Sequence, residues 1–439
     1  PSPPPPSFSS IVGEVEMMKR HPWLEKRAAA DSVAGATRSL PRGKTQRLWL
    51  VHGKWYDLNG FISQHPGGKF WIEQTRGQDI TDLVETHHMF PPEVLLKMLG
   101  KFYVGDAPSD YRPFFDYKED GFYRTLKRRC WEAIKKSGKG TNATPLFRLQ
   151  CSLVLVAHVL CFCCTAAWNS PAFAVLTGFT IAALHGIGHN FLHQKDSAWM
   201  FAALAGGWKV RRNRVSHVIS HHPRPNTNWD LEILGLEPWL YNMVDRPANS
   251  KWVVLYGPVL CMSGHLLDVV LMWKGLALGK EPFRLEYLSN ALQLGALAYC
   301  NGPAGGAVLF CIMFLTFGGI DSYAGYPLHH TESAWTVGDV SHKRKRDIGE
   351  HLVATTVDYC TDAAERGVLF WRNMFVYELM PNHLIHHCFP TLDCSRFQCI
   401  ADTFESTMQE FGLAQKKIPM PAIYFGMWPA WLRGDGKQH

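Results

Sequence analysis

The sequence predicts a multidomain fold, in which a small α+β domain is followed by an all-α membrane bundle with about four transmembrane helices. Three observations predict it: residues 1–150 are polar, several later stretches are long and apolar, and short histidine clusters stand beside those stretches. We expect four segments: 1–45, disordered or extended; 46–106, a small folded domain; 107–145, a linker and interfacial helix; and 146–439, the membrane domain.

The placement of basic residues and of cysteines indicates which partners and which compartment to expect. The chain has 439 residues and a net charge of +7, and its basic residues form local clusters beside the apolar stretches. That placement favours the cytosolic bias of Lys and Arg around membrane spans, so we expect no nucleic-acid partner. Several of the twelve cysteines lie in apolar stretches, which indicates buried thiols in a reducing compartment.

The small domain begins with alternating apolar residues and a turn at His52-Gly53, a pattern typical of a β-hairpin. His65 follows within the sequence His-Pro-Gly-Gly. Proline and glycine end a helix and allow close backbone approach, so this loop suits an axial haem ligand. His87 and His88 lie about two dozen residues downstream and are candidates for the second ligand.

The strings WYDLNGFISQHPGG, GQDIT and KFYVGDA resemble cytochrome b5. The resemblance implies one non-covalent haem b between two histidines, of which the first is His65. The second is best matched by His88, with His87 as the rival, because the phenylalanine usual before this ligand is Leu83 or Val84 here. An acidic rim would favour a basic NADH-cytochrome b5 reductase-type donor, and its candidate residues are Glu73, Asp79, Asp82 and Glu85.

The membrane domain contains four apolar stretches, at 146–168, 173–189, 252–273 and 287–326. The short uncharged turn between the first two predicts a helical hairpin. The last stretch is interrupted by Asn301-Gly302-Pro303. We expect one crossing from each of the last two stretches; the alternative is two crossings within 287–326, with 252–273 lying flat. Flanking basic residues place the histidine clusters on the cytosolic side.

The histidine clusters have the spacing of helix faces. In HGIGHNFLH and HVISHH, residues four apart share a face, and HLIHH repeats the pattern. Neutral imidazole suits iron, copper, nickel and zinc, and eight or nine histidines are too many for one ion but suit two. His193 is a further candidate ligand, although a place behind the ligands or at the surface is favoured. His158 and His265 stand singly in apolar stretches and are expected to be core residues.

These clusters resemble the histidine boxes of membrane fatty-acid desaturases and related hydroxylases over about residues 145–400. HGIGH resembles the HDxGH form, with Gly186 in place of the acid; HVISHHPRPN resembles HxxxHH with Asn226; and HLIHHCFPT matches the HHxFPT ending. His330 in PLHHTE matches an additional ligand position better than His329. Front-end desaturases have Gln where this chain has His383, whereas other desaturases have His. The fusion order is most similar to that of the animal cytochrome b5-related proteins.

The resemblance implies two non-haem iron ions. The implied ligands are His185, His189, His217, His221, His222, His330, His383, His386 and His387. The carboxylates expected to orient them are Asp230, Glu232, Glu332 and Asp393.

The implied function is a membrane oxidoreductase that uses O₂ and electrons relayed through its own haem domain to desaturate or hydroxylate an acyl chain, in the endoplasmic reticulum with haem and boxes facing the cytosol. The alternative is a membrane-anchored haem electron carrier on an inactive desaturase scaffold. A histidine-rich metal transporter is disfavoured, because it would place ionisable residues within the spans.

Overall fold

A computed structural model describes residues 47–244, 247–280, 283–337, 339, 346–359, 382–418 and 426–432. The chain forms two compact units. The first contains the residues up to Val84 together with Glu93–Phe115, and the second contains Glu85–Pro92 and the chain from Asp116 onward. The segment 1–45, expected to be disordered or extended, lies outside the described residues.

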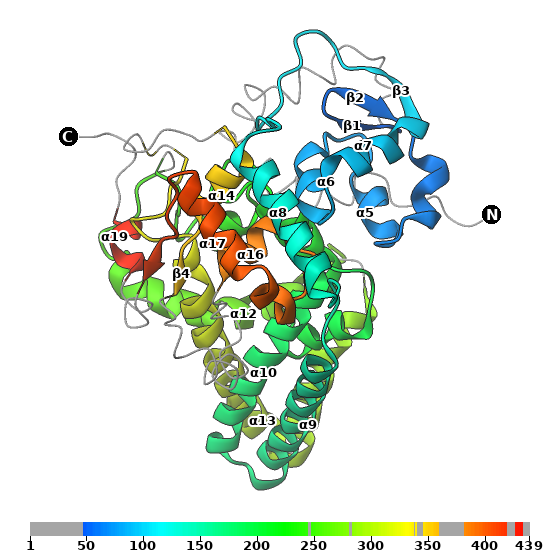
Figure 1. Ribbon diagram of the computed structural model, residues 1–439. Helices are drawn as coiled ribbons and strands as arrows, with labels where there is room; N and C mark the ends of the chain where they lie inside the picture. The colour runs from blue at the N-terminus through cyan, green and yellow to red at the C-terminus, as the bar shows by residue number, and fades with distance from the viewer. Residues whose placement is uncertain are drawn as a thin grey trace. The chain divides into compact units, whose positions relative to one another are not determined.

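The first unit holds a three-stranded antiparallel sheet in the order β1-β2-β3, formed by β1 (Trp49–Val51), β2 (Lys54–Tyr56) and β3 (Tyr103–Asp106). The predicted hairpin is confirmed: β1 and β2 pair across His52 and Gly53, whose φ angles of 48° and 70° are those of a tight hairpin turn. The short helices are η2 (Asn59–Gln64), α5 (Lys69–Gln74), α6 (Thr81–His87), α7 (Pro92–Leu99) and η3 (Gly100–Phe102) (Figure 1).

The core of the first unit forms around the sheet. Trp49 is fully buried, and its indole Nε1 donates to the carbonyl of Ile72 at 3.0 Å, so strand β1 is joined to helix α5. Leu50 and Trp55 pack together behind the hairpin. These contacts hold the loop that begins at His65 between η2 and α5.

The second unit is mostly helical. Two short parallel strands, β4 (Asp358–Tyr359) and β5 (Lys417–Ile418), are its only described strands. Its long helices are α8 (Phe122–Ser137), α9 (Pro145–Trp168), α10 (Pro171–Leu192), α12 (Val253–Ala277) and α13 (Leu288–Gly325). The shorter ones are η4 (Ala198–Gly206), α11 (Val210–Asn213), η5 (Arg214–His221), η6 (Glu232–Leu236), η7 (Leu285–Tyr287), η8 (Tyr326–Leu328), α14 (Ile348–Thr355), α16 (His383–Cys388), η10 (Cys394–Cys399), α17 (Ala401–Glu410) and α19 (Met427–Trp431).

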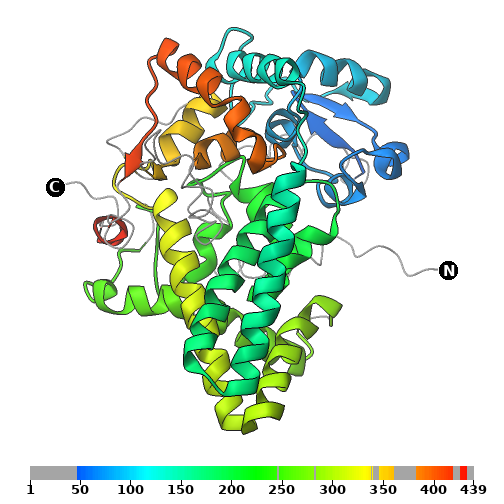
Figure 2. The ribbon, with the colours of Figure 1, turned by 60° about the horizontal axis from the view of Figure 1, so that its bottom comes forward.

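Four segments of the described chain are long and apolar enough to cross a membrane: α9, α10, α12 and residues 285–328. This confirms the expectation of about four transmembrane helices. The α9–α10 hairpin forms where the sequence predicts it, because Asn169 takes a left-handed conformation and Ser170 caps the helix that Pro171 begins. Helices α9, α10 and α13 run side by side, as both views of the ribbon show (Figures 1 and 2).

Helix α13 folds back on itself at Gly302, whose φ of 74° and ψ of 162° are not helical. A Cβ atom on Gly306 would lie only 2.5 Å from the backbone nitrogen of Ala298, a contact that a straight helix does not allow. The two halves are therefore antiparallel. This supports the second arrangement considered above, in which residues 287–326 contain two crossings, whereas the assignment of a crossing to α12 stays a prediction.

The core of the bundle lies between α10 and α13. Ile181 from α10 packs with Phe310, Phe314 and Phe317 from α13. A Cβ on Gly178 would lie 2.6 Å from the Cβ of Thr316, so glycine at this position allows the two helices to approach closely. This packing fixes the end of α10, which carries the first histidine cluster.

Candidate metal centre

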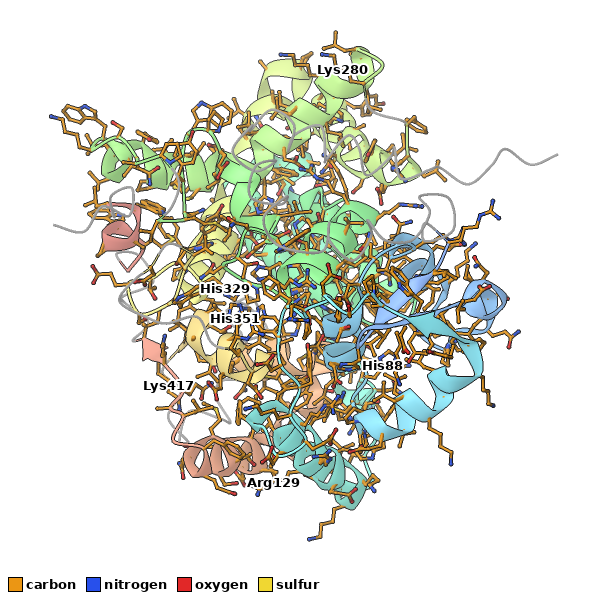
Figure 3. The ribbon with its side chains drawn as sticks, turned by 90° about the horizontal axis from the view of Figure 1, so that it is seen from above. His88, Arg129, Lys280, His329, His351 and Lys417 are labelled. Atoms are coloured by element: carbon orange, nitrogen blue, oxygen red, sulfur yellow. The ribbon has the colours of Figure 1, made fainter. Side chains whose placement is uncertain are left out.

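Eight buried histidines of the second unit offer nitrogen atoms that lie within 4.8 Å of one another in two groups. The first metal group is His189, His193, His217, His222 and His386. The second metal group is His221, His329 and His387. They come from four places in the chain: the end of α10, the turn of η5, the segment after η8, and α16. His329 lies in the crowded interior of this unit (Figure 3).

The two groups are neighbours, because the His-His pairs of the second and third boxes each contribute one ring to each group. In the second box, His222 belongs to the first metal group and His221 to the second, and the third box divides His386 and His387 in the same way. The rings of His222 and His387 stack with centroids 4.2 Å apart. Two groups of imidazoles side by side form a donor set for a pair of ions rather than for one.

The spacing within each group fits metal ligands. In the first, Nε2 of His217 lies 2.7 Å from Nε2 of His189 and 3.0 Å from Nε2 of His222. In the second, Nε2 of His329 lies 3.0 Å from Nε2 of His387. Two nitrogens that bind one ion at about 2.0–2.1 Å are separated by about 3 Å when the bonds are at right angles.

A π-helix explains how the second box serves both groups. η5 is a π-helix, in which the backbone N–H of His222 donates to the carbonyl of His217 at 2.9 Å. Residues five apart therefore share a face, and His217 and His222 enter the same group, while His221 turns to the other. The α-helical spacing expected from the sequence would instead pair His217 with His221.

Hydrogen bonds fix the protonation of two ligands in the second group. Nδ1 of His329 lies 3.0 Å from the carbonyl of Thr355, so Nδ1 carries the proton and Nε2 keeps its lone pair. Nδ1 of His221 lies 2.9 Å from the carboxylate of Asp230, which is buried. These are the partners that orient metal-binding imidazoles.

Burial keeps most of the cluster neutral, which metal binding requires. Burial, aided by neighbouring histidines, lowers the pKa of His217, His222 and His387 well below the usual value. His221 is the exception: burial lowers its pKa, but the charge and hydrogen bond of Asp230 outweigh burial and raise it.

Each group also contains buried ring nitrogens that have no hydrogen-bond partner within the described residues. Within the described part of the chain, neither nitrogen of His193 has a hydrogen-bond partner, nor has Nδ1 of His222 or of His387. Buried polar atoms without partners are uncommon, and a bound cation would satisfy one nitrogen of His193, whose ring belongs to the first metal group. The residues present therefore fit a pair of iron ions.

Asn226 and Asp358 hold the boxes in place. Asn226 has a φ of 57°, and its Nδ2 donates to the carbonyls of His329 and Trp335, so the loop after the second box is tied to the loop that carries His329. Asp358 accepts from the backbone nitrogen of Leu384 at 3.0 Å, within the third box. Burial raises the pKa of Asp358 to about 7.

Six of the nine proposed ligands fall within the two groups, and the others lie beside or apart from them. His383 contacts Nε2 of both His329 and His387, at 2.9 and 3.1 Å. His185 lies apart: its Nδ1 is 2.8 Å from Asp321, which also binds His265. His265, expected to be an ordinary core residue, thus has a polar partner.

Two of the histidines in the metal groups are not among the nine ligands proposed from the sequence. His329, rather than His330, enters the second metal group, and His193, rather than His185, enters the first. The spacing contained a signal for His193, since it lies four residues after His189 just as His189 lies four after His185. For His329 and His330 no periodicity was available, because the two residues follow the end of η8.

The four carboxylates expected to orient imidazoles differ in what they contact. Asp230 binds His221 as predicted, and Glu232 lies 4.0 Å from Nδ1 of His217. Asp393 instead accepts hydrogen bonds from Asn190 and from the backbone of Ser395, which places it behind the first box without an imidazole contact. Glu332 is exposed.

The haem candidate in the first unit is His65. Its Nδ1 lies 2.9 Å from the carbonyl of Gly68, so the proton sits on Nδ1 and the lone pair on Nε2, the form that an axial ligand needs. Gly68 has a φ of 99°, and a Cβ on Gly67 would lie 2.9 Å from the ring of His65. These residues fit a haem ligand. His88 belongs to the second unit, so its pairing with His65 stays a prediction.

Comparison with known proteins agrees with this geometry. The model for the cytochrome b5-like heme/steroid binding domain matches residues 38–108, and the model for fatty acid desaturase matches residues 165–419. The chain belongs to the fatty acid desaturase family. The desaturase match contains all the histidines of the two metal groups, and the haem-domain match contains His65, His87 and His88.

Relatives match this chain over most of their length. A cytochrome b5-related protein of Drosophila melanogaster is 30% identical over 404 residues, which cover 85% of this chain and 86% of the relative. An acyl-lipid (8-3)-desaturase of Physcomitrium patens is 24% identical, covering 84% of each chain. A probable Delta(5) fatty acid desaturase of Dictyostelium discoideum is 23% identical, covering 79% and 82%. No solved structure matches the chain.

These matches make the protein a desaturase-like oxidoreductase of the membrane with a fused haem domain.

Proposed function

We propose that this desaturase-family protein uses O₂ and electrons delivered through its own haem domain to desaturate, or hydroxylate, a fatty acyl chain. Haem b is held by His65 and His88, and two non-haem irons are held by the two metal groups. The electron donor is an NADH-cytochrome b5 reductase-type protein. The site faces the cytosol from a membrane of the endoplasmic reticulum.

One observation carries the proposal. Two neighbouring groups of buried histidines, with Nε2 atoms about 3 Å apart and with the His-His pairs of the second and third boxes divided between them, form a donor set for two ions. When bound, a pair of irons supplies the oxidising power that an unactivated C–H bond requires. A haem domain fused to the same chain supplies single electrons, which this chemistry consumes.

The chain's own residues position these groups and exclude water. Asp230 and the carbonyl of Thr355 orient His221 and His329, and Asn226 holds the two loops together. The rings of the groups are buried, which favours the neutral form of most of them and keeps water from the reacting centre. The first box lies at the end of an apolar helix of spanning length, which supports access of an acyl chain from the bilayer.

The test is non-haem iron per haem in the detergent-purified full-length protein, compared with a His386→Ala, His387→Ala double variant. We expect two non-haem irons per haem, both lost in the double variant, which removes one ligand from each group. His158→Gln is the matched control, since His158 bonds Thr180 within the bundle.

Haem without any bound non-haem metal, after anaerobic iron loading, would contradict the proposal and leave the electron-carrier alternative. Two irons that survive in the double variant would show that the metal lies elsewhere. Once the iron content is established, lipid product analysis separates desaturation from hydroxylation.

A further inference from the structure

The short segment Glu85–Pro92 packs within the second unit, although it carries both candidates for the second haem ligand. Glu85 is almost fully buried, and its carboxylate lies 2.6 Å from Arg124 and 3.7 Å from Lys127, both on α8. Lys127 also donates to the backbone carbonyl of Glu85 at 2.5 Å. Buried charges are stable only when paired, so these contacts fix the start of the segment firmly against α8.

Tyr123 joins the same segment to the third histidine box. Its buried hydroxyl lies 2.9 Å from the carbonyl of Cys388, the residue after His387, and 3.3 Å from the carbonyl of Glu85. The ring of Tyr123 also stacks on Phe389. One side chain thus bridges the haem-ligand segment and the segment that contributes a ligand to each metal group.

His87 is held on both sides by threonine. Nδ1 of its ring lies 2.9 Å from the hydroxyl of Thr86, and its carbonyl accepts a hydrogen bond of 3.0 Å from the hydroxyl of Thr391. Thr391 follows the third box by four residues. The backbone between His87 and His88 is therefore tied directly to the loop that ends the third box.

The segment that carries His87 lies beside the third histidine box, because Thr391 bonds the carbonyl of His87. Burial is the main cause of the lowered pKa of His193 and of His386, and His87 is among the nearby charges that lower both. The ring of His88 has different neighbours: it contacts Phe90, which in turn contacts Trp131. Side chains of adjacent residues at a helix end point in different directions, so the rings of His87 and His88 have different surroundings.

We propose that His87 is a positioning residue that carries the electron path from the haem ligand His88 to the first metal group. The inference rests on the proposed function and goes beyond it, because it names the segment of this chain that joins the two redox groups. It also assigns haem ligation to His88. In each transfer one electron leaves ferrous haem, which becomes ferric, and enters the iron pair; the NADH-dependent reductase replaces it, and His87 is unchanged overall.

The experiment follows haem re-oxidation in the full-length, iron-loaded protein after anaerobic reduction and rapid mixing with oxygenated buffer. The same protein without non-haem iron gives the direct reaction of haem with oxygen, which is subtracted. The variants are His87→Phe, which keeps a ring but removes both nitrogens, and Thr391→Val, which removes the hydroxyl and keeps the shape. Thr403→Val on α17 is the control.

We expect His87→Phe to keep the two-histidine haem absorption spectrum and the iron content, and to slow the iron-dependent re-oxidation by about tenfold, the lower range for losing a supporting partner of a metal site. Thr391→Val should slow it less, and Thr403→Val should leave it unchanged.

Three outcomes would overturn the proposal. Loss of the two-histidine haem spectrum in His87→Phe would make His87 the haem ligand. An unchanged re-oxidation rate in that variant would remove it from the path while leaving the iron centre intact. A wild-type protein that binds no non-haem iron would overturn the proposed function as well, and iron content distinguishes that failure from the first two.

Discussion

The two metal groups differ in how their ligands are held. In the second, a carboxylate and a backbone carbonyl bind the outer nitrogens of His221 and His329. In the first, the described chain gives His193 and the Nδ1 of His222 no hydrogen-bond partner. Five rings converge there, against three in the second group. Hydrogen bonds thus orient two of the three rings of the second group, the exception being His387, whose Nδ1 has no partner within the described chain. In the first group, His193 has neither of its nitrogens bonded there.

The difference follows from the elements that carry the rings. Two rings of the first group, His189 and His193, come from the end of a transmembrane helix, whose backbone polar groups are mostly bonded within the helix. In the second group, His329 follows the end of η8 and bonds the carbonyl of Thr355, and His221 bonds the carboxylate of Asp230.

The largest expected effect is the loss of one ion from the first group. His193→Ala removes a ring that lies among the ligands, whereas His185→Ala removes one that is bound to Asp321 outside both groups. We expect His193→Ala to reduce the non-haem iron from two per haem to one, and His185→Ala to retain both. Elemental analysis of the purified variants is the measurement. Iron lost in His185→Ala but kept in His193→Ala would show that His185, and not His193, is the ligand.

A smaller effect is expected where an orienting group is removed rather than a ligand. Asp230→Asn keeps the size of the side chain but removes the charge beside His221. We expect the affinity of the second group for metal to fall by about 10–100-fold, the usual range for such partners, with the first group unaffected. Competition with a chelator should then show one weak and one tight ion. Asp393→Asn, which faces Asn190 rather than a ring, is the control.

The spans and the haem-domain hairpin could be predicted from the sequence because they depend on local properties. Apolar length predicted α9 and α10, and the His52-Gly53 turn predicted the pairing of β1 with β2. The fold-back of α13 is different: Asn301-Gly302-Pro303 showed an interruption, but only the contact of Gly306 with Ala298 shows that the halves are antiparallel.

The sequence predicted the three histidine boxes, but it did not predict how their histidines divide between the two metal groups. Periodicity places residues on a helix face, and it assumed α-helical spacing where η5 is a π-helix, so the division of His221 from His222 could not be seen. The choice of His329 over His330 depends on the Thr355 carbonyl, which is 26 residues away in the chain. Contacts between distant segments decide such choices, and a single sequence does not contain them.

Acid should separate the two groups by the order in which they release metal, a subtler effect than either substitution. A ligand binds metal only when deprotonated, so protons compete once the pH falls toward its pKa. Burial lowers the pKa of His217, His222 and His386 in the first group, so protons compete there only in stronger acid. In the second group, burial lowers the pKa of His221, but the charge and the hydrogen bond of Asp230 together outweigh burial and raise that pKa, so protonation begins at higher pH.

We therefore expect the second group to release its ion first as the pH is lowered, and the order to disappear in Asp230→Asn, which removes the cause of the raised pKa of His221. Iron retained after brief acid exposure and desalting measures the order. Release of both ions at one pH in the wild-type protein would mean that the two groups bind metal as a single cooperative unit, in which Asp230 orients His221 without setting when it is protonated.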